Sequence, residues 1–165
     1  MNSYCQKLSS QAAATLEPGE AIVAATRCLP KGRSTRRAAG GVLGTVGILV
    51  ASTMGGSGQS AGGIALPTTI ALGLSAHRLL VFHLNDATER VSKLTHTIPL
   101  ADVWGASVGT GRKFGVRITY LDIALSDGSH LALEAASPHA KEGEAFGRAL
   151  AGAITPYALA RSRAS

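Results

Sequence analysis

Residues Gly105 to Gly109 read GASVG and match the G-x-S-x-G pattern, which can present a serine as a nucleophile. That chemistry requires the serine, here Ser107, to lie on a sharp turn between a strand and a helix. The following residues, Thr110 to Gly115 (TGRKFG), contain two glycines and are a poor start for a helix. We therefore expect that Ser107 is not a nucleophile.

Other patterns of catalytic or metal-binding residues are incomplete. Gly109 to Gly111 lacks the third glycine of a dinucleotide-binding loop, and no Gly-Lys-Ser/Thr sequence follows a glycine-rich turn. Cys5 and Cys28 are too few for a disulfide framework or a four-ligand metal site, and are expected to be reduced thiols. The five histidines lack the spacing of metal ligands, and the ten carboxylates are spread singly. The sequence predicts no enzyme, no metal, no cofactor and no catalytic residue.

The composition favours an anionic partner. Sixteen Lys and Arg against ten Asp and Glu give a net charge of +6 and a pI near 9.8. With only three Phe, three Tyr and one Trp, the chain lacks the stacking platforms of nucleic-acid binders, so nucleic acid is not expected as a partner. Two basic groups are candidate contacts with a membrane or another anion: Lys31, Arg33, Arg36 and Arg37, and then Arg112 and Lys113, with Arg117 nearby.

A long segment without charge follows the first basic group. Forty positions, Ala38 to His77, contain no Asp, Glu, Lys or Arg. Small residues suited to close packing repeat within it at Gly40, Gly44, Gly47, Ala51 and Gly55.

Three interpretations of this segment stay open. It can be an apolar helix that contacts a membrane. In that case Val42 to Ala51 would extend about 15 Å, half of a hydrocarbon core, which favours shallow insertion over a full span. The same face can instead pack on another copy or another protein in water. The third reading is a flexible glycine-rich loop, which suits Gly55 to Gly63 better than Val46 to Val50.

The elements that must carry these groups are mostly strands. Leu8 to Leu16 predicts a helix that ends before Pro18, and Ser137-Pro138 predicts the start of a last helix that Pro156 ends. Ser126 to Ser129 (SDGS) predicts a hairpin turn. Seven strands are expected, with a break at Gly109 to Gly111: Glu20–Leu29, Thr68–Leu74 (half-buried), Arg78–Leu84, Thr95–Leu100, Val103–Val108, Val116–Leu125 and a strand with Leu131 and Leu133.

This order predicts a mostly β, α+β fold in one domain, residues 1–165. The expected architecture is a bent antiparallel sheet or partial barrel of about seven strands, with a short N-terminal helix and a C-terminal capping helix. The predicted core consists of Ile22, Leu72, Leu79, Val81, Ile98, Val103, Ile118, Ile123, Leu131 and Leu133, packed by Phe146 and Leu150.

Several segments resemble the bacterial PH-like and GRAM-like domains. The resemblance is carried by Leu16–Ile22 (LEPGEAI), Leu74–Phe82 (LSAHRLLVF), Ile98–Val103 (IPLADV), Ile123–Gly128 (IALSDG), Leu131–Glu134 (LALE) and Gly143–Phe146 with Leu150. It implies a PH-like sheet with a C-terminal helix and a role in binding lipids, peptides or assembly partners. Ser75 stands where these domains often have Thr, and residues 33–67 form a glycine-rich apolar insertion where the family usually has a short loop.

The expected function is a non-catalytic binding module that attaches to the cytoplasmic face of the inner membrane through this insertion. Basic residues flank the cytoplasmic side of apolar segments, and each adds about 1 kcal/mol near an anionic leaflet. The alternatives are a soluble protein whose insertion joins subunits of a homo-oligomer or binds another protein, and a binder of anionic phospholipid headgroups.

Overall fold

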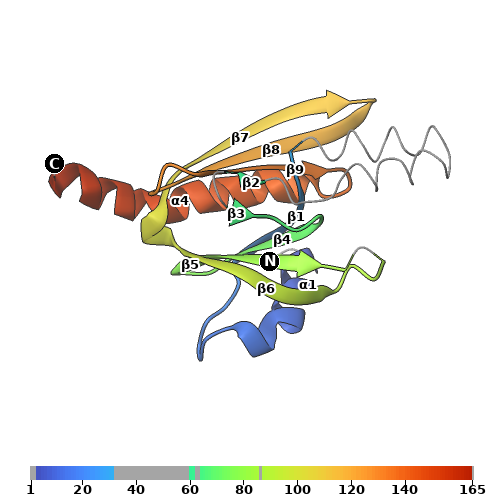
Figure 1. The fold of residues 1–165 in the computed structure, drawn as a ribbon, viewed down its shortest axis with the longest axis horizontal. Helices are drawn as coiled ribbons and strands as arrows, with labels where there is room; N and C mark the ends of the chain where they lie inside the picture. Colours follow the sequence, from blue (N-terminus) through green and yellow to red (C-terminus); the bar gives the residue numbers. More distant parts are fainter. Residues whose placement is uncertain (1–2, 32–59, 62–63, 86, 165) are drawn as a thin grey trace.

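The structure is a computed structural model of the chain, which describes residues 3–31, 60–61, 64–85 and 87–164. Its main element is an antiparallel sheet of seven strands in the order β6-β5-β4-β1-β9-β8-β7 (Figure 1). The strands are β1 Ala24–Pro30, β4 Ile70–Leu74, β5 Arg78–Leu84, β6 Val91–Pro99, β7 Val103–Lys113, β8 Val116–Leu125 and β9 His130–Ala136. A two-stranded sheet joins β2 Ser60–Ala61 and β3 Ile64–Ala65, and a 3-10 turn, η2, spans Leu100–Asp102.

Strand β1 connects two local meanders. On one side it pairs with β4, which continues into β5 and β6, and on the other side it pairs with β9, which is joined to β8 and β7. The expected mostly β, α+β fold class is confirmed. It is an open antiparallel sheet of seven strands with a short N-terminal helix and a C-terminal helix.

The two helices cover different faces of the sheet. The C-terminal helix, α4 Ala140–Ala164, packs mainly on β7, β1 and β8, and Figure 1 shows it between the two meanders. The N-terminal helix, α1 Ser3–Ala12, is followed by a 3-10 turn, η1 Ala13–Thr15, and lies on the opposite side of the β1 and β4 strands. The predicted helix at Leu8 to Leu16 therefore begins five residues too late. Tyr4 and Cys5, buried together with Leu8, extend the apolar stripe toward the N-terminus.

This arrangement produces two apolar clusters. The larger cluster contains the inner faces of both meanders and Phe146, Leu150 and Ile154 of α4. The smaller one lies beneath α1 and includes Leu8, Phe82 and other side chains of the outer face of β5. All twelve predicted core residues are buried.

The strand predicted at Thr68–Leu74 is present as β4, Ile70–Leu74, but the prediction that it is half-buried was wrong. Ile70, Leu72 and Leu74 face the larger cluster as expected, but all five residues of β4 are buried. The second face is covered because Ala71 packs in the cluster beneath α1, and Gly73 comes close to Leu8. A strand that is covered on both faces of the sheet is apolar on both faces. The alternating pattern in the sequence therefore underestimated how much of β4 is buried.

The predicted break at Gly109 to Gly111 is absent. β7 continues to Lys113, because each of these residues has a paired partner on β8, from Gly109 opposite Tyr120 to Gly111 opposite Ile118. Glycine weakens a strand but does not end one that a long neighbour pairs with. β6 likewise begins at Val91, earlier than predicted, and β1 begins only at Ala24.

The boundaries of the last helix also differ from the prediction. The Ser137 N–H donates to the carbonyl of Arg117 (3.0 Å), which keeps Ser137 on the sheet, so the helix begins at Ala140. Pro156 lies inside the helix rather than at its end. The proline leaves the carbonyl of Gly152 without its helical donor, and the exposed position of Gly152 lets water replace that donor.

Candidate functional site

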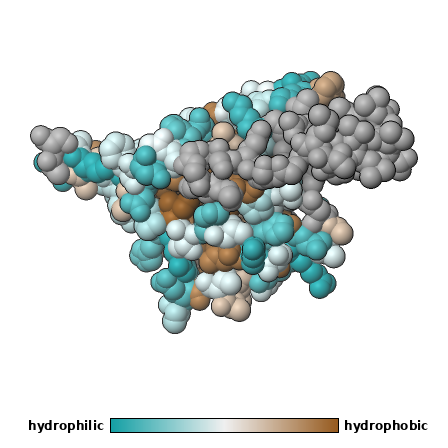
Figure 2. Space-filling model, in the orientation of Figure 1, coloured by the Kyte–Doolittle hydropathy of each residue, from teal (hydrophilic) through white to brown (hydrophobic). Residues whose placement is uncertain are grey.

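The tip of the β7–β8 hairpin combines exposed apolar and basic side chains. Lys113 pairs with Val116, so Phe114 and Gly115 form a two-residue turn with φ angles of 50° and 76°. The Phe114 side chain is 75% exposed and Val116 is 43% exposed. Figure 2 shows hydrophobic surface at the outer end of this hairpin, beside hydrophilic surface.

The basic side chains at this tip have different environments. Arg112 is exposed and lies directly opposite Arg117 in the strand register. Arg117 donates through Nη2 to Glu144 Oε2 on α4 (2.7 Å). Lys113 instead turns back along the sheet, where its Nζ donates to Glu134 Oε2 (3.3 Å) and lies 5.6 Å from the centre of the Tyr120 ring. Of the two predicted contacts here, Arg112 is therefore the one presented to solvent at the tip.

The basic surface beside Arg117 continues onto α4, where Arg148 lies next to Glu144. Glu144 accepts from Arg148 (2.6 Å) as well as from Arg117. The hydrogen bond from Arg148 and the nearby positive charges lower the pKa of the Glu144 carboxyl below its usual value. Glu144 is thus ionised at neutral pH, and the two arginines around one carboxylate leave this part of the surface positive.

Lys31 is separated from the tip. Its N–H donates to the carbonyl of Ala132 (3.0 Å), and Ala132 lies opposite Asp122 in the middle of β8. Lys31 therefore does not lie beside Arg112 at the tip of the hairpin. The remaining residues of these predictions, namely Arg33, Arg36, Arg37, Gly40, Gly44, Gly47, Ala51 and Gly55, lie outside the described residues.

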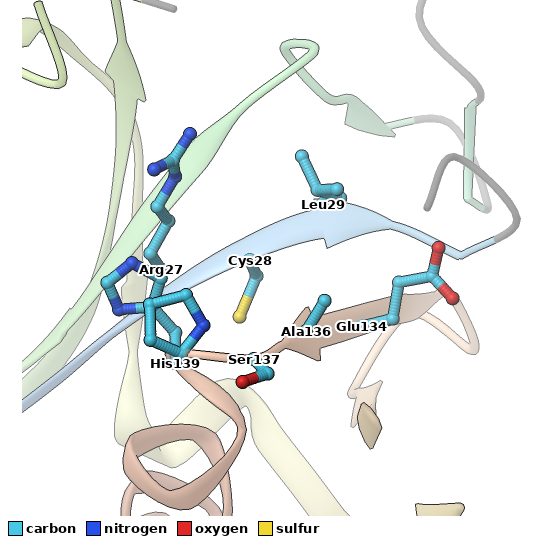
Figure 3. A pocket seen from close by; sticks show the side chains of 8 residues that line it. Arg27, Cys28, Leu29, Glu134, Ala136, Ser137 and His139 are labelled. Carbon is cyan, nitrogen blue, oxygen red and sulfur yellow. The ribbon is translucent and has the colours of Figure 1, made fainter. Parts of the chain in front are cut away.

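A pocket of about 230 Å³ lies where β1 and β9 diverge (Figure 3). Its lining includes Arg27, Cys28, Glu134 and His139. Arg27 forms an ion pair with Glu89, Glu134 with Lys113, and His139 Nδ1 lies 2.7 Å from Glu142 Oε2.

The thiol of Cys28 is not activated in this pocket. Burial raises its pKa to about 12, so the sulfur stays protonated at neutral pH and is a weak nucleophile. The two charged groups of the lining, Arg27 and Glu134, are each paired with an opposite charge outside the lining, Glu89 and Lys113. This arrangement stabilises the junction of the two meanders, and it does not bring an acid, a base and a nucleophile together.

A wider groove of about 760 Å³ lies where the chain returns from the insertion to the sheet. It is lined by Leu66, Pro67, Thr68, His83, Lys93, Leu94, Thr95 and His96. Lys93 is exposed, and His83 Nδ1 lies 3.3 Å from Ser92 Oγ. His96 Nδ1 is buried without a hydrogen-bond partner among the residues that the structure describes. One lysine and two histidines give this groove the chemistry to accept an anion, a feature that the histidine spacing in the sequence did not indicate.

The sequence motifs that suggested a family meet in a structural ion pair. Arg78 donates to Glu20 through Nε (2.8 Å) and Nη2 (2.5 Å), and its Nη1 lies 2.9 Å from Glu17 Oε1. The hydrogen bonds from Arg78 lower the pKa of Glu20 to about 2. These residues attach the loop before β1 to the start of β5, so their role is to hold the fold.

The serine motif lies entirely within β7, where Ser107 pairs with Asp122, so no turn into a helix presents its hydroxyl. Within the described ranges, no group of three or more His, Cys, Asp or Glu is placed to hold a metal ion. In the described part of the chain, no helix combines the length and the apolar character that are needed to cross a bilayer.

No model of a protein family matches the sequence, and no curated protein sequence matches it. Among solved structures, the chain is similar to a pleckstrin homology domain from Shewanella amazonensis SB2B. The TM-score is 0.46 at 15% sequence identity, and the similarity covers 93% of this chain and 96% of the other. The likeness to GRAM-like domains stays a prediction.

Proposed function

We propose that this chain is a non-catalytic binding module that attaches to an anionic membrane surface on the cytoplasmic side, through its insertion. The observation that carries this proposal is the charge pattern: the insertion has no Asp, Glu, Lys or Arg from Ala38 to Pro67, and this stretch directly follows the cluster of Lys31, Arg33, Arg36 and Arg37. Such a segment has basic groups for lipid headgroups next to apolar groups for the interior of the bilayer.

The described part of the fold supports this role because it holds both ends of the insertion in fixed positions. The insertion leaves the sheet after β1 and returns at β4, and these strands are paired neighbours from Ala24 opposite Leu74 to Cys28 opposite Ile70. Both strands lie inside the seven-stranded sheet. The two ends of the insertion are thus fixed to the centre of a packed domain, which reduces the conformational freedom lost when the segment binds.

Sedimentation with vesicles tests the proposal. We expect the full chain to bind vesicles of phosphatidylcholine with phosphatidylglycerol, and Arg33→Glu/Arg36→Glu/Arg37→Glu to lose that binding. Each reversal changes the charge by two, so three change the net charge from +6 to 0. A loss of about 1 kcal/mol per neutralised residue already predicts a decrease of more than a hundredfold.

The matched control makes the same change of net charge at other positions. Lys7→Glu/Lys141→Glu/Arg163→Glu also brings the net charge to 0, at three exposed positions on α1 and α4. This control should retain most of the binding. An equal loss in both triple variants would mean that overall charge alone attracts the protein, and full binding by the first variant would overturn the proposal.

Recognition of a phospholipid headgroup is a second candidate function, favoured by the groove that contains His83, Lys93 and His96. The same assay separates the two. Soluble glycerol phosphate at millimolar concentration should displace the protein from vesicles only when a headgroup site supplies most of the affinity. Attachment through the insertion is expected to resist this competitor, because the apolar contacts have no counterpart in it.

A further inference from the structure

Three features of the β7–β8 tip are unfavourable for an isolated folded domain. Phe114 has a φ of 50°, in the left-handed region that bulky side chains rarely adopt. The residue is 75% exposed to water. Arg112 and Arg117 lie directly opposite each other, and like charges at such a pair destabilise a sheet, an effect that the ion pair of Arg117 with Glu144 offsets only on one of the two strands.

Another residue would be more stable than phenylalanine at the first position of this turn. A two-residue hairpin turn with positive φ at both positions favours Asn-Gly or Asp-Gly. Gly115 meets this requirement with a φ of 76°, but Phe114 stands where asparagine fits best. Packing within the domain does not explain the phenylalanine, since most of its surface is exposed. Backbone strain of this kind is typical of residues that are retained for a function.

The same three features suit the interfacial region of an anionic bilayer. Phe114 and Val116 offer apolar surface at the extreme end of the hairpin, and Figure 1 shows this end projecting away from the rest of the sheet. Arg112 and Arg117 lie just behind them on the two strands. An aromatic side chain below the headgroups with arginines at headgroup level gains apolar burial and electrostatic attraction together.

We propose that the β7–β8 tip is a second membrane contact, in which Phe114 and Val116 enter the interface of an anionic bilayer while Arg112 and Arg117 contact its phosphates. This inference rests on the proposed attachment to membranes and adds a folded anchor that is separate in sequence from the insertion. Two contacts on one rigid sheet would fix the orientation of the domain on the surface, and each would raise the effective concentration of the other at the lipid.

The deciding variant is Phe114→Asn. Asparagine tolerates a positive φ, so the variant should fold at least as well as the parent while the apolar anchor is lost. We expect its partitioning to vesicles containing phosphatidylglycerol to decrease by about tenfold, the range expected for one large apolar side chain. Leu159→Gln is the matched control: it removes another exposed apolar side chain, 54% exposed on α4, and should leave partitioning unchanged.

A fluorescent variant reports insertion directly. Trp104 is the only tryptophan, so Trp104→Phe/Phe114→Trp places the single indole at the tip. Its emission should shift to shorter wavelength with phosphatidylglycerol vesicles and be quenched by lipids brominated on their acyl chains. At saturating vesicles, an unshifted and unquenched emission would overturn the proposal.

The outcomes separate this inference from the proposed function. If the Arg33, Arg36 and Arg37 reversals abolish binding but Phe114→Asn does not weaken it, the tip is not a contact and attachment through the insertion stands. If Phe114→Asn weakens binding while the reversals do not, the tip proposal stands and the role of the insertion falls. If the parent protein binds no anionic vesicle, both are overturned.

Discussion

The ion pair between Glu20 and Arg78 shows how single residues hold this fold. The carboxylate accepts two hydrogen bonds from one guanidinium, and the Glu20 side chain is only 6% exposed. Bidentate pairs of this kind are stronger and more specific than ordinary surface ion pairs. The pair of Glu20 and Arg78 also links the loop before β1, which has no regular structure, to the start of β5.

This pair predicts a pH dependence of stability. Because the folded-state pKa of Glu20 is lowered from 4.5 to about 2, its contribution is fully present above about pH 4.5 and is lost as the pH falls toward 2. Glu20→Gln should lower the free energy of unfolding at pH 7 by about 2 kcal/mol and flatten its decrease between pH 4.5 and 2. Urea titrations at several pH values measure both effects.

The exposed partner of the same arginine provides the control for that experiment. Glu17 has a side chain that is 67% exposed, so Glu17→Gln should change stability at pH 7 by less than about 1 kcal/mol. Equal losses in the two variants would contradict the view that the buried carboxylate holds the loop.

At the scale of elements, the contact between α4 and the sheet depends on two glycines one turn apart. A Cβ added at Gly143 would lie 2.7 Å from the Cβ of Ala135, and one at Gly147 would lie 2.2 Å from Val108 Cγ2. The helix backbone therefore approaches β9 and β7 closely at these two positions. By contrast, a Cβ at Gly152 would meet no atom within 4 Å.

Gly143→Ala should destabilise the protein by about 1–2 kcal/mol. Overpacking costs about 1–3 kcal/mol, and the better helix propensity of alanine recovers up to about 1 kcal/mol. The methyl group of Ala135 has no rotamer into which it can move, so the backbone must shift instead. Gly152→Ala, in open space on the same helix, should stabilise by up to about 1 kcal/mol. Thermal unfolding of the two variants should show opposite shifts of Tm, and a Gly143→Ala variant as stable as the parent would refute this close packing.

Element boundaries were predictable where turn residues mark them. β5 and β8 have the predicted bounds, and the turn between β8 and β9 is confirmed, with Asp127 Oδ1 accepting from the Ser129 N–H (2.8 Å) and Gly128 at a φ of 81°. Boundaries failed where a local signal competes with pairing or packing, as in the glycines of β7 and Pro156 of α4.

The candidate tip illustrates why part of a site cannot be predicted from sequence. Arg112 was expected as a contact, but Phe114 was not, because a phenylalanine beside a glycine reads as a loop residue until the strand register places it at the turn. Lys113 is adjacent in sequence to Arg112 yet reaches Glu134, since successive residues of a strand point to opposite faces. Only the structure separates these two neighbours.

At the scale of the whole molecule, the insertion raises the question of self-association. Deleting residues 38–66 with a short Gly-Ser replacement should leave the oligomeric state in lipid-free buffer unchanged if this segment binds membranes, and should remove vesicle binding. A large species in the parent protein that collapses to a monomer on deletion would instead support the subunit-joining alternative. Analytical ultracentrifugation of both proteins, with vesicle sedimentation alongside, decides between them.

The central place of β1 has a consequence for how the chain must fold. β4 to β6 and β7 to β9 are each joined by turns between consecutive strands, so each trio can assemble from contacts close in sequence. β1 has no such neighbour: Ala24 pairs with Leu74, and Leu29 pairs with Glu134. Closing these long loops costs more chain entropy than any hairpin in the domain, so the two trios become a single cooperative unit only when this strand is added between them.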